Sequence, residues 1–580
     1  MSKTPNYDAK VKAILDATKP GEKTCQLTGD NWYMDENEIE IYRKYKVPPS
    51  KYAPLIRMKL IHGYFVMFDM WYNKHPQTGE PIISCTHPST GINVLPDKEW
   101  FTKDFIDRGR DIDLESSFFD QIYKLSRQVP LAACYNYIPP ENSLAFISLG
   151  DKDSFFVLAC KSKRCYYCMN GYDIENSAEL ALVYNVQSSY NIVHSERIHN
   201  CKFVREGHDC LNSSFLFDCR NCEYCFGATN KRNRKYLFWN EQLSKDEWEH
   251  RVAEVDLSFY KIRRHWEEKF RELVASSIWP ENFNLQTENS TGEYLTRTTN
   301  VYNSYYVING CRDLDHISYA FSSPSHDCHY AAGIFGACDN YYGVGYGNTS
   351  GSKFCLSILS SCLNMEFCNS CFECENCFGC FGLRHKKFCI LNKQYTEDEY
   401  WQKVDQLKCA MLDRGEYGDF PPMYHSTQYW SGSGASIIYG ATQEECQKFG
   451  CANFAPGDDG AEGPEIDLSK IELIQTIPDR LDETNIGSLS GKPFRDEIFN
   501  RRFGYLKSEL AFYQKMKIAP PRQHPTRRIQ ELYAEMNLAV CEEQYCQKCK
   551  KEIMVAKNKN YTERIVYCRD CYFQFLEQNG

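Results

Sequence analysis

Four cysteines near the end of the chain have the spacing of a zinc ribbon. Cys546 and Cys549 form one CxxC pair, and Cys568 and Cys571 form a second pair after eighteen intervening residues. In each pair two sulfurs converge from one tight turn, and four thiolates together bind Zn²⁺ tetrahedrally. The stretch between the pairs, 552-EIMVAKNKNYTERIVY-567, has the β-branched character of a hairpin. Because four cysteine ligands leave no open position for water, the sequence predicts one structural zinc ion.

A second group of cysteines follows a strict three-residue spacing in 367-FCNSCFECENCFGC-380. Thiolates at this spacing could bind zinc, or they could supply most ligands of an iron–sulfur cluster. Alternatively, the cysteines are small buried side chains at inward positions of stacked turns. We call the members of this group the second ladder: Cys368, Cys371, Cys374, Cys377 and Cys380.

An internal duplication favours the packing interpretation of this ladder. Residues 210–252 align without a gap to residues 362–404, and seventeen of the 43 positions are identical. The earlier copy keeps only three of the five cysteines and has Leu216 and Ala228 at the outer positions. An apolar side chain can replace a packing cysteine but cannot replace a metal ligand. The zinc and iron–sulfur alternatives stay open, and the cysteines of the first ladder are Cys219, Cys222 and Cys225.

The surroundings of both ladders predict irregular β-structure. Segments such as 303-NSYYVINGCRDLDHISYAF-321 and 354-FCLSILSSC-362 alternate short β-prone runs with Asn, Asp, Ser and Gly. This pattern is typical of an irregular β-solenoid. Between the two copies, residues 246–274 have apolar side chains at three- and four-residue intervals, which predicts helix.

A second duplication relates the two ends of the chain. Residues 38–58 match residues 509–529 at an offset of 471, and the same offset continues to Phe101 and Tyr572. At this offset the four zinc-ribbon cysteines correspond to His75, Thr78, Asp97 and Trp100. Thr is a poor zinc ligand and Trp is none, so the N-terminal copy is expected to keep the ribbon shape without the ion. A different metal site, built from His75, Cys85 and His87, is the alternative.

These observations predict a mixed α+β, multidomain fold: two duplicated β-solenoid-like Cys-rich repeats, joined by a helical segment and flanked by zinc-ribbon-like terminal modules. The predicted divisions are an N-terminal tail (1–24), a degenerate zinc-ribbon-like module (25–105), a helical connector (106–150), Cys-rich β-repeat 1 (151–245), a helical linker (246–300), Cys-rich β-repeat 2 (301–404), a connector (405–456), an acidic linker (457–487) and a basic zinc-ribbon module (488–580).

The charge of the chain is unevenly distributed. The net charge is −10, yet from Gly491 to the end 17 Lys and Arg face 11 Asp and Glu, a difference of +6. Cations that bind phosphates, interleaved with aromatic side chains that stack on bases, suit nucleic-acid binding. The alternative is a solvated, charged face on a small zinc domain. The candidate nucleic-acid-binding residues are Arg522, Arg527, Arg528, Lys548, Lys550, Lys551, Arg564 and Arg569.

Four parts of the sequence together form a recognisable series: 371-CFECENCFGCFGLRHKKFCILNKQYTEDEY-400, 490-SGKPFR-495, 509-ELAFYQKMKIAPPRQHPTRR-528 and the two CxxC pairs around 546–572. In this series the chain resembles a family of uncharacterised cysteine-rich zinc-ribbon proteins of candidate-phyla (patescibacterial) bacteria. Family members typically have cysteine knuckles in the N-terminal ribbon as well, and this chain lacks them. The resemblance implies the architecture, and it implies no activity.

Several function classes lack their sequence signatures. The chain has no GxGxxG after a strand, no P-loop, no HExxH and no GxSxG. It has no apolar run of about 18 residues that would span a membrane, and its N-terminus does not have the pattern of a secretory signal. We therefore expect a cytoplasmic, non-enzymatic scaffold with protein partners. The alternatives are an RNA- or DNA-binding, for example ribosome-associated, factor and an iron–sulfur protein.

Overall fold

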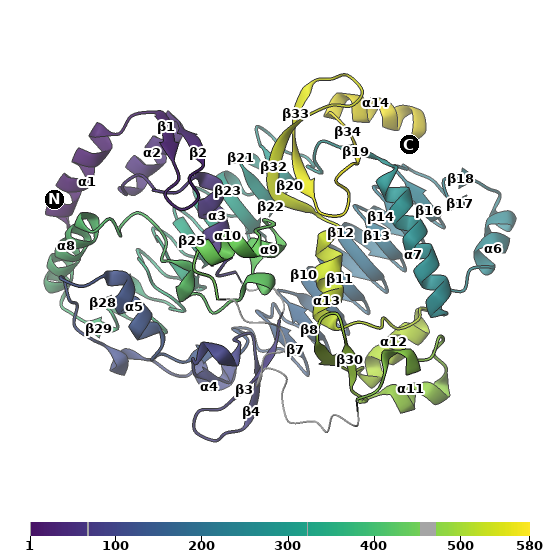
Figure 1. Ribbon diagram of the computed structural model, residues 1–580, viewed down its shortest axis with the longest axis horizontal. Helices are drawn as coiled ribbons and strands as arrows, with labels where there is room; N and C mark the ends of the chain where they lie inside the picture. The colour runs from purple at the N-terminus through teal and green to yellow at the C-terminus, as the bar shows by residue number, and fades with distance from the viewer. Residues whose placement is uncertain (1, 66–68, 322, 453–470) are drawn as a thin grey trace.

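The computed structural model describes residues 2–65, 69–321, 323–452 and 471–580. The fold is mixed α/β, with several separate sheets, which agrees with the predicted class. Two stacks of short parallel strands lie at its centre, and helices and hairpins from both ends of the chain cover them (Figure 1). We call these the first stack (141–242) and the second stack (285–394).

Within a stack, the chain returns beside itself after eleven to fourteen residues, most often after twelve. In the first stack Tyr166 pairs with Ala178, which pairs in turn with Tyr190, always in parallel. In the second stack Cys377 pairs with Cys389 in the same way. A turn of twelve residues has four corners, spaced three residues apart.

The corners are made by a left-handed residue at every third position. Tyr167, Asn170 and Asp173 have φ of 56°, 52° and 54°, and the same spacing continues through most of both stacks. Positive φ is uncommon for residues other than Gly, so its regular repetition defines this architecture. In most turns the residue that follows a left-handed position points into the stack, as buried Cys168 and Ile174 do.

The first stack contains more strands than the second. Its strands are β7 (Leu144–Phe146), β8 (Phe155–Leu158), β9 (Lys161–Lys163), β10 (Tyr166–Glu175), β11 (Ala178–Gln187), β12 (Tyr190–His199), β13 (Lys202–Arg205), β14 (His208–Leu211), β15 (Ser214–Phe217), β16 (Phe226–Thr229), β17 (Leu237–Phe238) and β18 (Glu241–Gln242). The strands of the second stack are β20 (Gly292–Thr296), β21 (Thr299–Tyr302), β22 (Ser304–Ile308), β23 (Arg312–Ala320), β24 (His329–Ile334), β25 (Tyr341–Tyr346), β26 (Leu356–Ile358), β27 (Glu375–Phe378), β28 (Lys387–Ile390) and β29 (Lys393–Gln394).

The two ends of the chain form units with the same order of elements, as the 471-residue offset predicts. The N-terminal unit consists of β1 (Gly21–Thr24), β2 (Asn31–Met34), α2 (Glu36–Tyr45), α3 (Pro54–His62), β3 (Trp71–Lys74), β4 (Pro81–Ser84), β5 (Val94–Leu95) and α4 (Asp97–Trp100). The C-terminal unit consists of β30 (Phe494–Asp496), β31 (Arg501–Phe503), α12 (Lys507–Lys515), α13 (Pro525–Ala534), β32 (Asn537–Tyr545), β33 (Glu552–Asn558), β34 (Ile565–Tyr567) and α14 (Arg569–Asn579).

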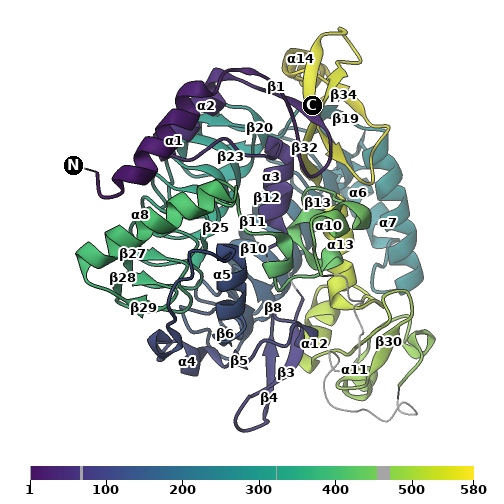
Figure 2. The same ribbon diagram turned by 60° about the vertical axis from the view of Figure 1, so that its left-hand side comes forward.

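Each terminal unit packs against one stack and pairs with the strand that leads into the other, which is a crossed arrangement. Helix α3 packs against β24 and β25 of the second stack, whereas α13 packs against β11 and β12 of the first. The strand at the end of each unit pairs with the segment leading into the other stack: β5 pairs with β6 (Leu131–Ala132), and β34 pairs with β19 (Ile278–Pro280). Figure 2 shows α3 and α13 on the same side of the stacked strands.

Further helices connect the units and cover the stacks. They are α1 (Pro5–Ala17), α5 (Phe118–Ser126), α6 (Lys245–Ala253), α7 (Tyr260–Ala275), α8 (Glu397–Asp413), α9 (Gly434–Ile437), α10 (Gln443–Lys448) and α11 (Glu483–Leu489), with 3-10 turns η1 (Pro88–Thr90), η2 (Ile106–Arg108), η3 (Met423–His425), η4 (Trp430–Gly432) and η6 (Ile474–Thr476). The helix predicted over 246–274 is two helices, because α6 ends before α7 begins.

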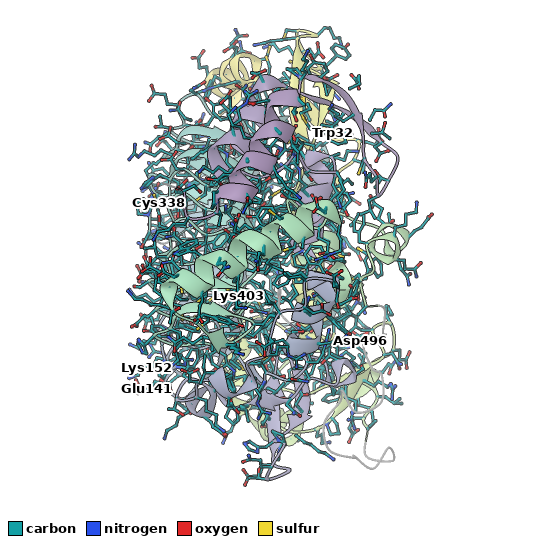
Figure 3. All side chains as sticks on the ribbon, turned by 90° about the vertical axis from the view of Figure 1, so that its left-hand side faces the viewer. Trp32, Glu141, Lys152, Cys338, Lys403 and Asp496 are labelled. Carbon is teal, nitrogen blue, oxygen red and sulfur yellow. The ribbon has the colours of Figure 1, made fainter. Side chains whose placement is uncertain are left out.

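Several predicted divisions differ from the structure. Residues 1–24 are not only a tail, since α1 buries Tyr7, Val11 and Leu15 and packs against α8. The first stack begins inside the predicted connector 106–150, where Glu141 bridges to Lys152. The side chains of this pair form an ion pair of 2.8 Å, and Figure 3 shows them together at the surface.

The second stack also begins earlier than predicted. Only part of the predicted acidic linker lies within the described residues. Leu285 bridges to Thr296, which places the start of the stack inside the predicted helical linker 246–300. Residues 457–470 of the predicted acidic linker lie outside the described residues. The remainder, 471–487, is packed, because Ile477 and Leu481 are buried. The composition of residues 285–300 and 471–487 predicts a linker, but it contains no information on the distant elements against which these residues pack.

Candidate metal centre

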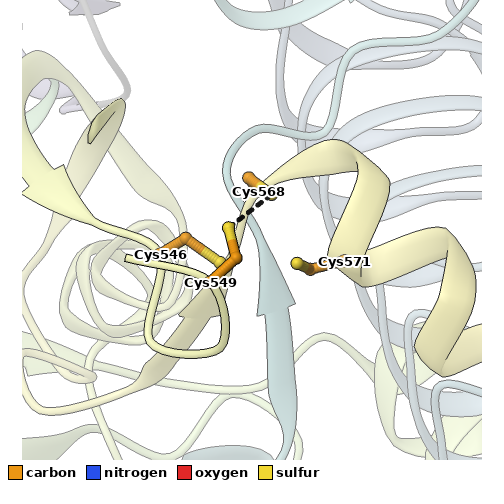
Figure 4. Close-up of side chains that lie close together, drawn as sticks. All are labelled: Cys546, Cys549, Cys568 and Cys571. Atoms are coloured by element: carbon orange, nitrogen blue, oxygen red, sulfur yellow. Dashed lines mark hydrogen bonds between the residues drawn. The ribbon is translucent and has the colours of Figure 1, made fainter. Parts of the chain in front are cut away.

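The four zinc-ribbon cysteines converge at one point. Their Sγ atoms all lie within 4.8 Å of one another. The Sγ atoms of Cys549 and Cys568 are 3.6 Å apart (Figure 4). Four sulfurs at about 2.3 Å from a tetrahedral ion are about 3.8 Å from one another, so this spacing fits a bound metal.

Two elements bring the sulfurs together. The hairpin β32–β33 ends in a turn in which the N–H of Cys546 donates to the carbonyl of Lys551 at 2.8 Å, and the N–H of Lys550 donates back to Cys546 at 2.8 Å. Helix α14 begins directly after Cys568, so Cys568 and Cys571 occupy its first turn. The pairing of β34 with β19 fixes the helix against the rest of the molecule.

The surroundings of Cys546 favour a thiolate. Burial raises the pKa of this thiol, but backbone N–H groups of Cys549, Cys568 and Lys548 point at the sulfur and lower the pKa to about 6. Burial and the neighbouring thiols raise the pKa of Cys571 to about 12. A bound cation displaces such protons, because cysteine binds metals as the thiolate.

A metal ion bound by these four sulfurs would occupy a closed site of the structural type. Cys546, Cys568 and Cys571 are buried and Cys549 is exposed. All four donors are sulfur, which leaves no position for substrate or water in a tetrahedral complex. This donor set fits Zn²⁺, and it also suits other thiophilic ions.

The same turn closes two hairpins of the N-terminal unit. In 25-CQLTGD-30 the N–H of Cys25 donates to Asp30 at 2.8 Å, and in 75-HPQTGE-80 the N–H of His75 donates to Glu80 at 2.8 Å. The first ring nitrogen of His75, Nδ1, accepts the N–H groups of Gln77 and Thr78, each at 3.2 Å. His75 therefore occupies the position of Cys546 and accepts equivalent hydrogen bonds.

In the N-terminal unit, the side chains at the positions of the zinc-ribbon cysteines form hydrogen bonds with other protein groups. The Nε2 atom of His75 lies 2.9 Å from Glu99. Asp97, the equivalent of Cys568, accepts the N–H groups of Cys134, Tyr135 and Asn136 at 2.9, 3.2 and 3.0 Å. Among the described residues, no group of three or more metal ligands gathers here. The predicted alternative of His75 with Cys85 and His87 is therefore not assembled.

The ladder cysteines point into the stacks. All eight are buried, and each sulfur lies against the backbone carbonyl two residues earlier, as Cys225 does with Glu223 at 3.4 Å. Serines at equivalent corners make the same bond: Ser213 donates to Leu211 at 2.7 Å and Ser189 to Gln187 at 2.8 Å. The other ladder contacts are those of Cys219, Cys222, Cys368, Cys371, Cys374, Cys377 and Cys380.

Cysteine and serine alternate along one column of the first stack. At twelve-residue spacing the column reads Ser189, Cys201, Ser213 and Cys225. Each side chain is small and satisfies one corner carbonyl, which explains both the abundance of cysteine and the ease of its replacement. In the described part of the chain, the one group of three or more converging ligands is the C-terminal one.

Half of the predicted nucleic-acid residues are not on a basic surface. Arg528 is 3 % exposed and lies 2.7 Å from Glu179. Arg522 donates to the carbonyl of Ile477 at 2.9 Å. The remaining two are Arg527, paired with Asp496 and Glu531, and Arg564, which donates to the carbonyls of Tyr561 and Ala556.

The other half surrounds the metal centre. Lys548, Lys550 and Lys551 are exposed on the β32–β33 turn, and Arg569 is exposed on α14. Tyr545 and Phe573 are also exposed, at 67 % and 51 %. The equivalent N-terminal turn has Gln77, Gly79 and Glu80 in place of the three lysines, so the basic character belongs to the C-terminal copy.

A buried Glu–Tyr–Arg group is repeated in both terminal units and was missed from the sequence. In the N-terminal unit, Arg57 and the hydroxyl of Tyr42 each donate to Glu38 at 2.5 Å. The guanidinium of Arg57 lies 3.8 Å from the ring of Tyr330 in the second stack. The C-terminal equivalents, Glu509, Tyr513 and Arg528, contact Tyr167 of the first stack. The sequence signal for this group is that the Glu, Tyr and Arg are all identical between the two ends of the chain at the 471-residue offset.

Within the described residues, no helix combines the length and the apolar character needed to cross a bilayer. Comparison with known proteins gives no relative: no family model matches the chain, and no curated protein matches it either.

Proposed function

We propose that this protein is a non-enzymatic, cytoplasmic scaffold that binds a protein partner through the outer faces of its two solenoid-like stacks. A structural zinc ion at the Cys546 centre would stabilise the C-terminal unit. The proposal includes membership of the cysteine-rich zinc-ribbon group that the sequence resembles. The proposal is supported by the geometry of the stack surface and by the convergence of the four sulfurs.

The observation that carries the proposal is a regular ladder of side chains on the outer faces of the stacks, exposed at Asn200 and half-buried at Tyr172 and Tyr184. Asn200 donates to Asn212 at 2.8 Å, twelve residues ahead. Tyr172 and Tyr184 stack with their ring centroids 5.5 Å apart. Such ladders hold side chains at a fixed spacing, and ordered side chains lose little entropy on binding. Aromatic residues are also enriched in protein interfaces.

A photo-crosslinking experiment tests the scaffold function. A photoreactive phenylalanine analogue replaces Tyr184 in the full-length protein in its native cells, and adducts are identified by mass spectrometry. The matched control places the analogue at Tyr33, which is 62 % exposed on the N-terminal hairpin. We expect a discrete protein adduct from position 184 only. An identical adduct pattern from both positions, or none from 184, contradicts the proposal.

RNA or DNA binding is the second candidate, and the exposed cations around the metal centre favour it. Lysines for phosphates lie beside Tyr545 and Phe573, whose rings could stack on bases. A ribosome-associated role is one form of this candidate. The described face also contains Glu543, Glu552 and Asp570, all exposed, which reduces its net positive charge.

Charge reversal separates the two candidates. The variant carries Lys548→Glu, Lys550→Glu and Lys551→Glu, and its control carries Lys19→Glu, Lys98→Glu and Lys245→Glu at exposed positions elsewhere. If the second candidate holds, nucleic acid copurifies with the wild type and the control but not with the variant. Equal recovery from all three proteins assigns any binding to another surface.

A further inference from the structure

A cavity of about 160 Å³ lies between the two stacks. The first stack contributes Phe146 and Leu158 to its lining, and the second stack contributes Phe335 and Leu356. The segment that follows α8 closes another side with Phe420. The cavity is separate from the four zinc-ribbon cysteines and from the outer-face side chains Asn200, Tyr172 and Tyr184, so the proposed scaffold function does not use it.

The lining carries no formal charge. Among the described residues around the cavity there is no Lys, Arg, Asp or Glu. The one titratable imidazole, His425, stays neutral because burial lowers its pKa to about 3. Hydroxyl and amide groups, for example those of Ser126, Asn170 and Asn369, add a few hydrogen-bonding positions to walls that are otherwise aromatic and aliphatic. Such walls favour an uncharged ligand.

Small residues on opposite stacks create the space. Phe354 and Phe367 occupy left-handed corners of the second stack and pack with their ring centroids 4.7 Å apart. The next corner along the same turn as Phe354 is Ser357, and across the cavity the first stack presents Ala159. The side chains of Ser357 and Ala159 are too small to fill the space between the stacks. The left-handed backbone at these positions is also compatible with a phenylalanine, as at Phe354.

The size of the gap indicates the size of the ligand. Protein interiors are close-packed, and voids much larger than a water molecule are few. A cavity of about 150 Å³ with a similar apolar lining binds benzene. We propose that this cavity is a binding site for an uncharged, mainly apolar small molecule about the size of one aromatic ring, with a hydroxyl or carbonyl substituent.

The test compares three probes of equal size and different charge. Benzyl alcohol, benzoate and benzylammonium are titrated into the full-length protein, and binding is followed by ligand-observed NMR and by the unfolding temperature. We expect benzyl alcohol to bind and raise the unfolding temperature, and the two ions to bind at least ten-fold more weakly. No binding of benzyl alcohol, or equal binding of benzoate, overturns the proposal.

Occluding substitutions locate the binding. Ser357→Phe and Ala159→Phe fill the cavity from opposite stacks, at φ of 53° and 48° where Phe354 is held at 57°. Ser361→Phe is the control, because Ser361 is exposed in the same stack at φ of 46°. We expect either filling variant that retains the wild-type circular dichroism to lose benzyl alcohol binding at least ten-fold, and the control to retain it. Unchanged binding in a folded filling variant overturns the assignment. If both filling variants unfold, Ser357→Leu makes the same test with a smaller side chain.

Discussion

The guanidinium of Arg528 lies 2.7 Å from the carboxylate of Glu179, although 349 residues separate them in the chain. Arg528 also contacts Tyr513 at 3.0 Å, and it lies over the ring of Tyr167. The pair joins α13 of the C-terminal unit to β11 of the first stack inside the protein, away from water. Arg528, which the sequence predicts to be part of a nucleic-acid-binding surface, instead joins two distant elements inside the protein.

Replacing Arg528 with Met is expected to destabilise the fold strongly. The substitution leaves Glu179 and Glu509 buried without their cation, and breaking a buried pair in this way costs about 3–5 kcal/mol. Arg569→Met, on an exposed arginine, is the control and is expected to stay within about 0.5 kcal/mol. Urea unfolding followed by circular dichroism measures both. Similar losses for the two variants would contradict the buried role.

Removing one sulfur is expected to remove the metal. Purified protein should contain one zinc ion per chain by elemental analysis, and Cys568→Ser should lose it, because three thiolates and a hydroxyl bind Zn²⁺ far more weakly. Cys541→Ser provides the control, since Cys541 is an exposed cysteine on the same hairpin. Loss of the metal from the control as well, or wild-type protein without metal, would be inconsistent with the site.

Serine should substitute for a ladder cysteine at small cost. Cys225→Ser retains a donor for the carbonyl of Glu223, as Ser213 has for Leu211 in the turn before, so we expect a loss of about 1 kcal/mol or less. Cys225→Leu overfills the corner and is expected to cost about 1–3 kcal/mol. Both variants should keep the metal content of the wild type and remain colourless. A brown wild-type preparation that Cys225→Ser bleaches would instead indicate an iron–sulfur cluster.

Acid should weaken the protein through buried neutral histidines. His62 is fully buried, its Nδ1 lies 2.7 Å from the carbonyl of Met58, and burial lowers its pKa to about 4 from the ordinary 6.5. Below pH 6.5 the unfolded chain binds a proton that the folded chain does not, so stability falls until the pH reaches the folded value. At pH 5 the loss from this group is about 2 kcal/mol.

A substitution isolates the contribution of His62. In His62→Phe the proton-binding group is absent from both states, so the loss of stability between pH 7 and pH 5 should be smaller than in the wild type by about 2 kcal/mol. Urea unfolding at the two pH values gives the difference. Equal losses in the wild type and the variant would show that the imidazole is already protonated, or accessible, in the folded protein.

The features predicted best from the sequence are those set by local geometry. A CxxC pair specifies a tight turn by itself, so the positions of Cys546 and Cys549 could be read from their spacing. The three-residue spacing of the ladders likewise comes from a local event, the left-handed corner before each inward residue. The twin copy with Leu216 and Ala228 already indicated that these positions accept other small or apolar side chains.

The twelve-residue turn and the buried arginines could not be read in the same way. The inward positions that follow the corners accept Cys, Ser, Val and Leu alike, so no single residue type repeats along the stacks with a period of twelve. The partner of Arg528 is Glu179, in a segment with no sequence relation to it. Sequence shows that an arginine is charged, but its neighbours, which decide whether it faces solvent or a carboxylate, become visible only when distant segments are brought together.

The crossed contacts of the terminal units have a consequence for biosynthesis. Strands β10 to β12 leave the ribosome long before α12 and α13 are translated, so their covered face, including Tyr167 and Tyr190, waits exposed while more than three hundred further residues are made. In the same way, the N-terminal helix α3 lacks its packing partners in the second stack until strands β24 and β25 have been translated. Synthesis of α12 and α13 is therefore coupled to folding of the first stack, and truncation before these helices would leave apolar surface open to aggregation.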